Sequence, residues 1–447
     1  MRGIGQSLAV PLVMATLSCS EILGVEEREL RSDGGAGAGA GGAAGGAPSA
    51  GGQGGSGGSG VACPLSTCDG ECVDTLRSTE HCGACDNACA GEDACLAGVC
   101  DRHLRGGRGS FAECVRVDTG MKCRGTGAWG ELGNGEVYPD DVLSWIDVTL
   151  VPDAIFAANS ARSTCFLTQI GEVRCVGSNL DGELGIGTTD GPDDANQQPG
   201  CCHLEQPVAP LLPRGSKVLD LAAGGFWPSG NFYCALLENG DVYCWGTTVP
   251  SPLKKLENAR QIEAGNNFAC ALLDSGEVWC WGTDADDVLN PVAARPPSIV
   301  EGLPPVRAIG SARDTVYAVA GDGRLFAWGA NSHGQLGPGA TVGLRYYPAR
   351  EIAIELPSPI VQVAGAGTAV CVLLADGTVR CWGEGGYQGD GTPPGGVELV
   401  PHQVPLADVV ELAANTQSYL ARTRDGAFYH WGYVTGAQLA LTPIEVP

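Results

Sequence analysis

The segment CALLDSGEVWCWG, residues 270–282, decides the fold, because close copies of it recur along the C-terminal three quarters of the chain. CALLENGDVYCWG begins at Cys234 and CVLLADGTVRCWG at Cys371. More divergent copies begin at Cys114, Cys165, Tyr317 and Leu420. The glycines that close the seven copies, from Gly125 to Gly432, lie about 51 residues apart on average. The chain therefore consists largely of one repeated unit.

Each copy is predicted to form a β-hairpin. Two short apolar runs flank a turn that carries glycine at one fixed position, as in Asp274-Ser275-Gly276. The last residue of such a three-residue loop adopts a left-handed conformation, which glycine reaches without strain. A further short strand ending in Ala-Gly or Ala-Asn precedes most copies. Seven repeats of three or four short strands fit an all-β propeller with seven blades around one axis.

The register of the hairpin predicts disulfide bonds. With a three-residue turn Cys270 lies opposite Cys280, at a Cα separation of about 4.5–5.5 Å, which a disulfide tolerates. Where one cysteine of a pair is absent its partner is absent too, as at Leu420 and His430. The expected pairs are Cys114–Cys123, Cys165–Cys175, Cys234–Cys244, Cys270–Cys280 and Cys371–Cys381. The first pair is one residue closer in sequence and needs a bulge or a tighter turn. Buried free thiols are the alternative.

The pattern AAG…CALL-x-x-G-x-V-x-CWG…G-x-LG resembles the repeat of the regulator of chromosome condensation (RCC1) family. The resemblance covers about residue 110 to residue 447 and implies a seven-bladed β-propeller. Bacterial secreted members of that family bind their targets with propeller loops, and eukaryotic members exchange the nucleotide of a small GTPase. The resemblance therefore implies a bacterial, myxobacterial-type member that is secreted or lipid-anchored.

The first 19 residues are predicted to direct export. Residues 8–17 are apolar, too few to span a bilayer, and typical of the central region of a signal peptide. The following Ser18-Cys19 resembles a bacterial lipoprotein cleavage site, so Cys19 is the expected lipidation site. A plain secreted protein and an uncleaved apolar start are the alternatives. The expected location is the outer membrane or cell surface, or the medium.

A linker and a small cysteine-rich module precede the propeller. Residues 20–62 form the predicted linker, of which residues 34–60 are almost only Gly, Ala and Ser. Eight cysteines lie within residues 63–100, so structural disulfides are expected to replace the missing apolar core. A redox or zinc role for Cys82-Gly-Ala-Cys85 is the alternative. The module resembles cysteine-rich spacers of myxobacterial surface proteins, and the propeller is assigned to residues 104–447.

The two ends of the propeller are predicted to meet in one blade. The first hairpin, from Cys114, lacks the Pro-containing strand that precedes most others. Residues 441–447, LTPIEVP, resemble such a strand with no hairpin after it. We therefore expect the C-terminus to complete the first blade and close the ring.

Composition gives little support to catalysis or nucleic-acid binding. The chain has 26 Lys+Arg against 51 Asp+Glu and a net charge of −25, which opposes contact with phosphates. None of the six histidines has a metal-ligand partner at short spacing, and no calcium-loop spacing accompanies the acidic clusters. We expect no catalytic residue, no metal and no cofactor. Five tryptophans are expected to pack between blades rather than to stack on a carbohydrate: Trp245, Trp281, Trp328, Trp382 and Trp431.

One long loop is a candidate contact surface. Residues 188–207 enlarge the second repeat, and long ordered loops on a rigid ring are where binding surfaces develop. Its candidate residues are Asp190, Asp193, Asp194, Cys201, Cys202 and His203. A decorated loop without a partner is the alternative.

Three functions remain open on the sequence. The first is a surface-tethered module that binds a protein or a glycan at the cell envelope, with a membrane contact through its lipid anchor only. The second is an enzyme with an active site in the central pocket. The third is nucleotide exchange on a small GTPase, which export and the acidic charge oppose.

Overall fold

The structure is a computed structural model, and it describes the propeller almost completely. The described residues are 66–68, 71–73, 95–96, 99–100, 104–106, 112–117, 119–189, 203–226, 229–246, 256, 258–282, 297–434 and 438–446. The chain divides into two units, Met1–Ala62 with Gln198–Gly200, and Cys63–Gln197 with Cys201–Pro447. The propeller lies in the second unit. The predicted export segment, Cys19 and the linker lie outside the described residues.

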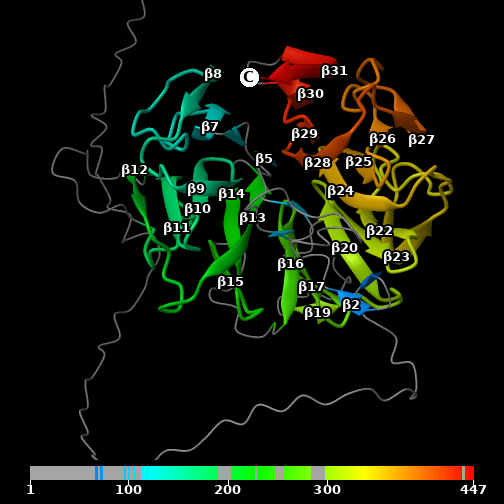
Figure 1. The fold of residues 1–447 in the computed structure, drawn as a ribbon, viewed down its shortest axis with the longest axis horizontal. Coiled ribbons are helices and arrows are strands. Elements are labelled where there is room, and N and C mark those ends of the chain that lie inside the picture. Colours follow the sequence, from blue (N-terminus) through cyan, green and yellow to red (C-terminus); the bar gives the residue numbers. More distant parts are fainter. Residues whose placement is uncertain are drawn as a thin grey trace, which may run out of the picture. The chain divides into compact units, whose positions relative to one another are not determined.

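Seven antiparallel sheets follow one another along the chain and form the seven blades of a β-propeller (Figure 1). Blade 1 contains β5 (Leu104–Gly106), β6 (Glu113–Val117), β7 (Gly120–Gly125) and β8 (Val142–Asp147). Blade 2 contains β9 (Ala154–Asn159), β10 (Ser163–Thr168), β11 (Val173–Ser178) and β12 (His203–Val208). Blade 3 contains β13 (Val218–Phe226), β14 (Ser229–Leu237) and β15 (Val242–Gly246).

The other four blades have four strands each. Blade 4 contains β16 (Ala259–Ala264), β17 (Phe268–Leu273), β18 (Val278–Gly282) and β19 (Ser298–Ile299). Blade 5 contains β20 (Val306–Ser311), β21 (Thr315–Ala320), β22 (Leu325–Ala330) and β23 (Arg345–Ile352). Blade 6 contains β24 (Ile360–Ala366), β25 (Ala369–Leu374), β26 (Val379–Glu384) and β27 (Val397–Gln403). Blade 7 contains β28 (Val409–Ala414), β29 (Ser418–Thr423), β30 (Phe428–Val434) and β31 (Gln438–Val446).

Four short strands precede the propeller, in the predicted cysteine-rich module. β1 (Ser66–Cys68) pairs with β2 (Glu71–Val73), and β3 (Cys95–Leu96) pairs with β4 (Val99–Cys100). Most of the module lies outside the described residues, and so does its predicted cysteine pairing. Within the described part of the chain, no helix is long and apolar enough to cross a membrane.

The alternation of strand direction gives the propeller two different faces. We call one the loop face: it carries the turns between the first and second strands of each blade and the loops between the third and fourth. In blade 5 these are residues 312–314 and 331–344. The opposite end, the turn face, carries the hairpin turns such as that of Gly276 and the links between blades.

The hairpins have the predicted register. Cys270 lies opposite Cys280 and Leu272 opposite Val278, and Gly276 closes the turn with φ +83°. The first hairpin has a tighter turn, because its Val117 already pairs with Gly120. Disulfides join the predicted cysteines in five blades: Cys114–Cys123, Cys165–Cys175, Cys234–Cys244, Cys270–Cys280 and Cys371–Cys381.

Removing one disulfide is expected to weaken the propeller without abolishing it. Each bond closes a short loop, so Cys371→Ala with Cys381→Ala should cost about 2–3 kcal/mol of unfolding free energy. Blade 5 forms the same hairpin register with Tyr317 opposite Ala327 and no bond, so the sheet itself should survive. Denaturant unfolding checks this. Adding reductant should lower the unfolding free energy of the native protein more than that of the variant, because the variant already lacks one disulfide. An equal decrease in both proteins would contradict the prediction.

The predicted ring closure is wrong. The C-terminal strand β31 pairs with β30 in blade 7, where Phe428 lies opposite Val446. Blade 1 instead takes its innermost strand from its own repeat, because β5 pairs with β6 and places Arg105 opposite Cys114. The Pro-containing segment therefore forms the outermost strand of its own blade, and the first and last blades of the propeller are each a complete sheet. Side-chain packing between blades 1 and 7 must then close the ring.

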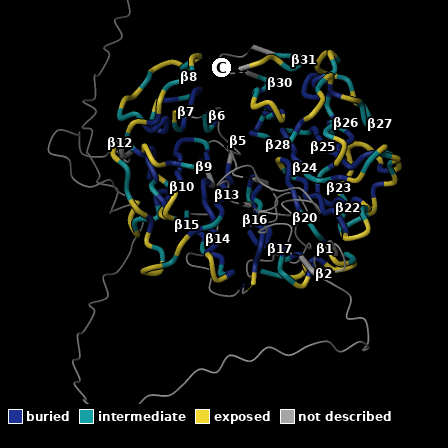
Figure 2. The backbone as a smooth tube through the Cα atoms, in the orientation of Figure 1, coloured by how far each residue is buried: buried dark blue, intermediate teal, exposed yellow. Residues whose placement is uncertain are grey.

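The core consists of apolar layers between neighbouring blades (Figure 2). The predicted row of tryptophans is buried there, and Trp281, Trp328, Trp382 and Trp431 have no exposed surface. Trp382 donates its indole N–H to the carbonyl of Gln335 in the preceding blade at 3.1 Å. These tryptophans hold blades together, so they do not form a carbohydrate-stacking surface.

Candidate functional site

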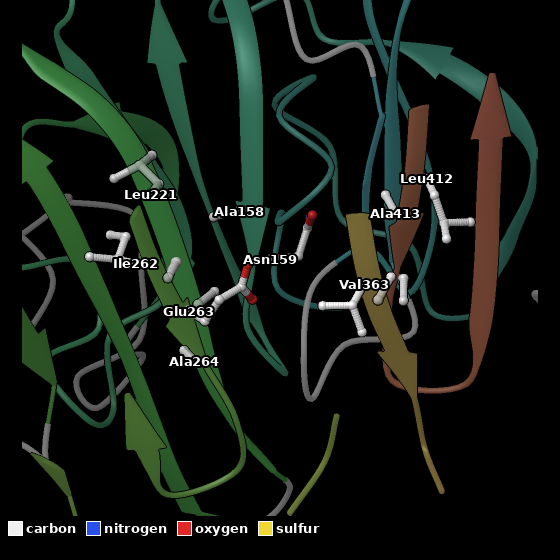
Figure 3. A pocket seen from close by; sticks show the side chains of 13 residues that line it. Ala158, Asn159, Leu221, Ile262, Glu263, Ala264, Val363, Leu412 and Ala413 are labelled. Carbon is white, nitrogen blue, oxygen red and sulfur yellow. The ribbon is translucent and has the colours of Figure 1, made fainter. Parts of the chain in front are cut away.

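The central channel is narrow and offers little chemistry. A cavity of about 80 Å³ lies between the first strands of blades 2, 3, 4, 6 and 7 (Figure 3). This is room for a few water molecules, whereas pockets for small-molecule ligands hold about 300–1,000 Å³. The channel lining is mostly alanine, leucine, isoleucine and valine, with Asn159 and Glu263 as its polar side chains.

Among the described side chains, Glu263 is the charged residue at its level of the channel. It lies opposite Cys270, and the residues at the equivalent position of the other blades whose side chains are described are small: Ala158, Ala222, Gly310, Ala364 and Ala413. The hydroxyl of Ser311 donates to Oε2 of Glu263 at 3.2 Å, and the amide of Gln261 lies 3.4 Å from Oε1. The described residues contain no cluster of three or more metal-ligating side chains.

Two buried carboxyls support loops of the loop face. Glu131 accepts the backbone N–H of Trp129 at 2.7 Å, and Glu183 accepts that of Asp181 at 2.6 Å. Burial raises the pKa of Glu131 to about 7, and it raises the pKa of Glu183 as well. In blade 5 the neutral Gln335 accepts the N–H of His333 in the same way, at 2.8 Å. Because an uncharged amide does the same work, we assign these carboxyls to loop structure.

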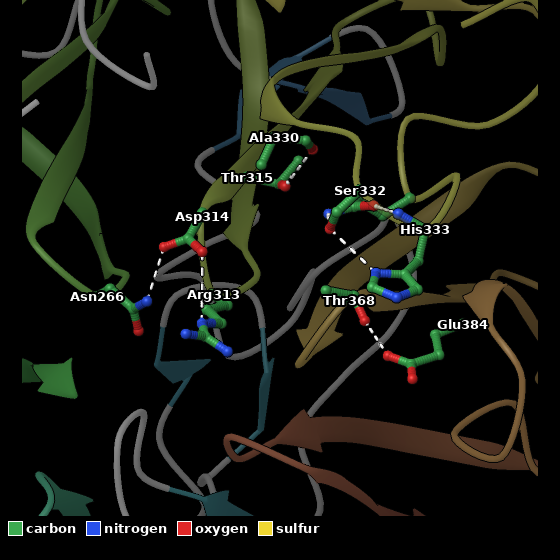
Figure 4. Close-up of polar contacts among 10 residues, drawn as sticks. Asn266, Arg313, Asp314, Thr315, Ala330, Ser332, His333, Thr368 and Glu384 are labelled. Carbon is green, nitrogen blue, oxygen red and sulfur yellow. Dashed lines mark hydrogen bonds and ion pairs between the residues drawn. The ribbon is translucent and has the colours of Figure 1, made fainter. Parts of the chain in front are cut away.

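Polar side chains of neighbouring blades meet on the loop face (Figure 4). Asn266 donates to Asp314 at 2.7 Å, and Arg313 lies 3.4 Å from the same carboxylate. The hydroxyl of Thr368 donates to Glu384 in blade 6. These contacts fix the short turns of blades 4, 5 and 6 and leave the Arg313 guanidinium partly exposed.

Two tyrosines lie on the same face between blades 6 and 7. The rings of Tyr387 and Tyr433 are 5.4 Å apart between centroids and tilted by 51°. Burial, and then the negative charge of Glu384, raise the pKa of Tyr387, while Arg313 acts in the opposite direction. Tyr387 is therefore a neutral, packed side chain in the electrostatic range of Arg313.

Exposed apolar side chains from blades 5 and 6 lie on the same loop face. Val342, Leu344 and Val397 are 38%, 53% and 40% exposed. A Cβ on Gly334 would lie 2.5 Å from Leu399 and 2.9 Å from Val397, both in β27 of blade 6, and 3.7 Å from Val342 of its own blade. The loop that follows His333 therefore packs against β27. We define the loop-face patch as Arg313, Val342, Leu344, Tyr387, Val397 and Tyr433.

The contact loop predicted from the sequence, residues 188–207, belongs to blade 2 and is not part of the loop-face patch. Asp190, Asp193, Asp194, Cys201 and Cys202 lie outside the described residues, and only the backbone of His203 is described, as the start of β12. Sequence reasoning missed the loop-face patch, because its members come from three repeats. The one local signal was the pair of apolar residues in the loop segment Thr341-Val342-Gly343-Leu344.

Comparison with known proteins supports the repeat family. Sequence models of the regulator of chromosome condensation (RCC1) repeat match residues 229–247, 259–286 and 322–373. A model of the stigma-specific STIG1-like protein family matches residues 55–103, which include the cysteine-rich segment.

Similar curated proteins differ widely in length. The chain is 26% identical over 394 residues to the guanine nucleotide exchange factor SRM1 of Saccharomyces cerevisiae, covering 72% of this chain and 80% of that protein. It is 27% identical over 333 residues to the E3 ubiquitin-protein ligase HERC2 of Mus musculus, covering 71% of this chain and 6% of HERC2.

Solved structures share the fold. Yeast RCC1 (Prp20) bound to Kap60 has a TM-score of 0.62 and 21% identity, covering 77% of this chain and 87% of that one. Human WBSCR16 has a TM-score of 0.61 and 20% identity, covering 73% and 93%. At these identities the likeness establishes the seven-bladed propeller and nothing about its ligand.

Proposed function

We propose that this chain, a propeller of RCC1 repeats, is an exported binding module that recognises a protein through the loop-face patch. The observation that carries the proposal is the patch itself, where three exposed apolar side chains and a partly exposed arginine lie on the same face as two packed tyrosines. Arginine and tyrosine are enriched among the residues that dominate protein interfaces, and apolar anchors supply buried area beside them. A glycan is the alternative ligand.

A rigid scaffold supports this role. Five blades carry an internal disulfide, and the indole of Trp382 bonds to the preceding blade. A preorganised surface loses little conformational entropy when it binds. Disulfides persist in oxidising compartments, which favours export, with Cys19 as the proposed site of a lipid anchor. The channel, by contrast, has room for water rather than for a substrate.

Charge on the patch should weaken binding. Leu344→Asp with Val397→Asp places carboxylates where the partner would bury apolar surface, so affinity should fall about 10-fold or more. The matched control is Ile170→Asp, an apolar residue of the turn face that is 61% exposed. The measurement is a pull-down from the cell envelope with the wild-type chain, followed by affinity of the recovered partner for each variant.

The outcomes separate the possible surfaces. Equal loss in the patch variant and in Ile170→Asp would reject a site on the loop face. If deletion of residues 190–202 removes binding while the patch variant binds normally, the contact lies on blade 2 instead. Recovery of a polysaccharide rather than a protein would replace the proposed partner by a glycan.

Nucleotide exchange is the second candidate, favoured by the similarity to SRM1 over 80% of that protein. A cytosolic location in cell fractionation, together with accelerated nucleotide release from a small GTPase, would support it. Localisation at the cell envelope without accelerated nucleotide release would favour the binding module instead.

A further inference from the structure

Among the described side chains, the contact between blades 1 and 7 has the fewest buried apolar residues. Among the described side chains it contains four buried apolar residues, Val115, Ala413, Leu420 and Phe428. Each of the other apolar layers contains at least eleven. No strand crosses this seam, because β31 stays in blade 7 and β5 belongs to blade 1. Other interactions must therefore contribute to closing the ring.

A buried triangle of ionisable side chains spans the seam. Arg124 Nε lies 2.5 Å from Oε1 of Glu113, both in blade 1. Arg124 Nη2 lies 2.9 Å from Nδ1 of His430, in blade 7, and His430 Nε2 lies 3.2 Å from Oε2 of Glu113. The three residues are 1%, 8% and 0% exposed for Glu113, Arg124 and His430. The guanidinium also covers the ring of Trp145 at 4.3 Å.

The chemistry of arginine fixes the state of this histidine. A guanidinium only donates hydrogen bonds, so Nδ1 of His430 must accept from Arg124 and cannot carry a proton. The imidazole is then neutral with its proton on Nε2, facing Glu113. Oε2 of Glu113 and Nε2 of His430 are buried and make no hydrogen bond, so their 3.2 Å approach is an electrostatic contact. The geometry therefore requires neutral His430.

We propose that Glu113, Arg124 and His430 form an acid-sensitive latch, which joins blades 1 and 7 at neutral pH and releases the seam when His430 is protonated. A proton on Nδ1 removes the acceptor of the Arg124 hydrogen bond and sets two cations against each other. The seam should then open locally before the rest of the propeller unfolds, because the buried imidazolium and guanidinium repel each other at this contact. Blades 2 to 6 do not contain the triangle and should stay folded.

The direction of the His430 pKa shift agrees with opening of the seam at low pH. Burial, the largest cause, lowers the pKa of His430; Glu113 raises it and Arg124 lowers it. The unfolded or opened chain therefore takes up a proton that the closed seam resists, so stability falls as the pH drops below the ordinary histidine range.

Two other charged pairs face the seam among the described side chains. Lys122 lies 2.5 Å from Asp147 in blade 1, and Arg422 lies 3.2 Å from Glu411 in blade 7. Neither pair includes a histidine, so His430 is the imidazole of this cluster, and its pKa is lowered below the ordinary histidine range.

The strand register allows a disulfide to be introduced at the position of His430 as a control for the latch. Leu420 lies opposite His430 in the same way as Cys371 lies opposite Cys381. The double variant Leu420→Cys with His430→Cys would give blade 7 the disulfide that five other blades have. It removes the titrating group and reinforces the strand pair at once. His430→Gln is the milder variant, because a glutamine carbonyl can still accept from Arg124 at every pH.

Hydrogen exchange with mass spectrometry tests the latch on the full chain at about pH 7.5 and about pH 5. Protection of β6, β7 and β30, relative to β21 and β22 of blade 5, should fall at least about 10-fold at the lower pH. In His430→Gln and in the double cysteine variant, the protection of β6, β7 and β30 relative to β21 and β22 should be the same at both pH values. His402→Gln, which alters an exposed histidine, should behave as wild type. An unchanged wild-type ratio, or opening of His430→Gln to the wild-type extent, would overturn the proposal.

Discussion

Arg124→Met is expected to lower the free energy of unfolding by about 3–5 kcal/mol, because it leaves a buried carboxylate without its cation. The Glu113 side chain is 2% exposed, and its closest charge partner is Arg124 at 2.5 Å. Methionine keeps most of the volume against Trp145, so the loss reports charge rather than a cavity. Denaturant unfolding at neutral pH measures the effect.

Two further variants decide whether the buried charge is the cause. Glu113→Gln combined with Arg124→Met should recover much of the stability, since removing both partners leaves no uncompensated charge. Arg324→Met breaks an exposed pairing with Asp322 and Glu351 and should change stability little. If Arg124→Met costs no more than Arg324→Met, the triangle does not hold the seam.

Glu131→Gln is expected to stabilise the propeller above neutral pH by up to about 3 kcal/mol, because it removes a buried group whose ionised form is disfavoured. Burial raises the pKa of the Glu131 carboxyl from its ordinary value of 4.5 to about 7. Glutamine can accept the N–H of Trp129 without any charge to bury, as Gln335 does for His333. Unfolding free energies measured across pH 4 to pH 9 test this prediction.

The sign of the pH dependence follows from proton binding. Above pH 4.5 the unfolded chain releases the Glu131 proton, while the folded chain keeps it until about pH 7. Stability due to this group is therefore complete below pH 4.5 and is lost as the pH rises through 7. The advantage of Glu131→Gln should vanish near pH 4. Glu301→Gln, in an exposed turn, should show no such trend, and a pH-independent difference for Glu131→Gln would contradict burial of a neutral carboxyl.

These two pH effects act in opposite directions and can be separated. Acidification below the ordinary histidine range weakens the seam through His430, whereas it relieves the buried carboxyl of Glu131. Unfolding of the whole propeller reports the sum, and hydrogen exchange of blades 1 and 7 reports the seam alone. Glu131→Gln should therefore make the His430 effect easier to observe in global unfolding.

Local patterns in the sequence predicted the blades well. The partner of Cys270 is only ten residues away, and a three-residue turn with glycine at its end sets the register between them. Such pairings depend on short-range geometry, so they can be read without knowing what surrounds the hairpin. Seven recurrences of the same unit then indicated the propeller, since one blade cannot bury its own faces.

The error in ring closure shows where this reasoning stops. The C-terminal segment was assigned to blade 1 because it resembles the strand that precedes a hairpin. That strand belongs to the outside of the preceding blade, so β31 completes blade 7. A strand pattern gives direction and exposure, but it does not say which of two neighbouring sheets receives the strand.

The sequence by itself determined the repeat, the hairpin register, the disulfide pairs and the number of blades, because each depends on residues close together in the chain. Only the tertiary structure decided how the ring closes and where the loop-face patch lies. Arg124 and His430 are 306 residues apart, and circular closure of seven wedges brings them to 2.9 Å. The physical reason is that the covalent chain fixes the geometry within a blade, whereas the packing of complete blades fixes which distant side chains meet.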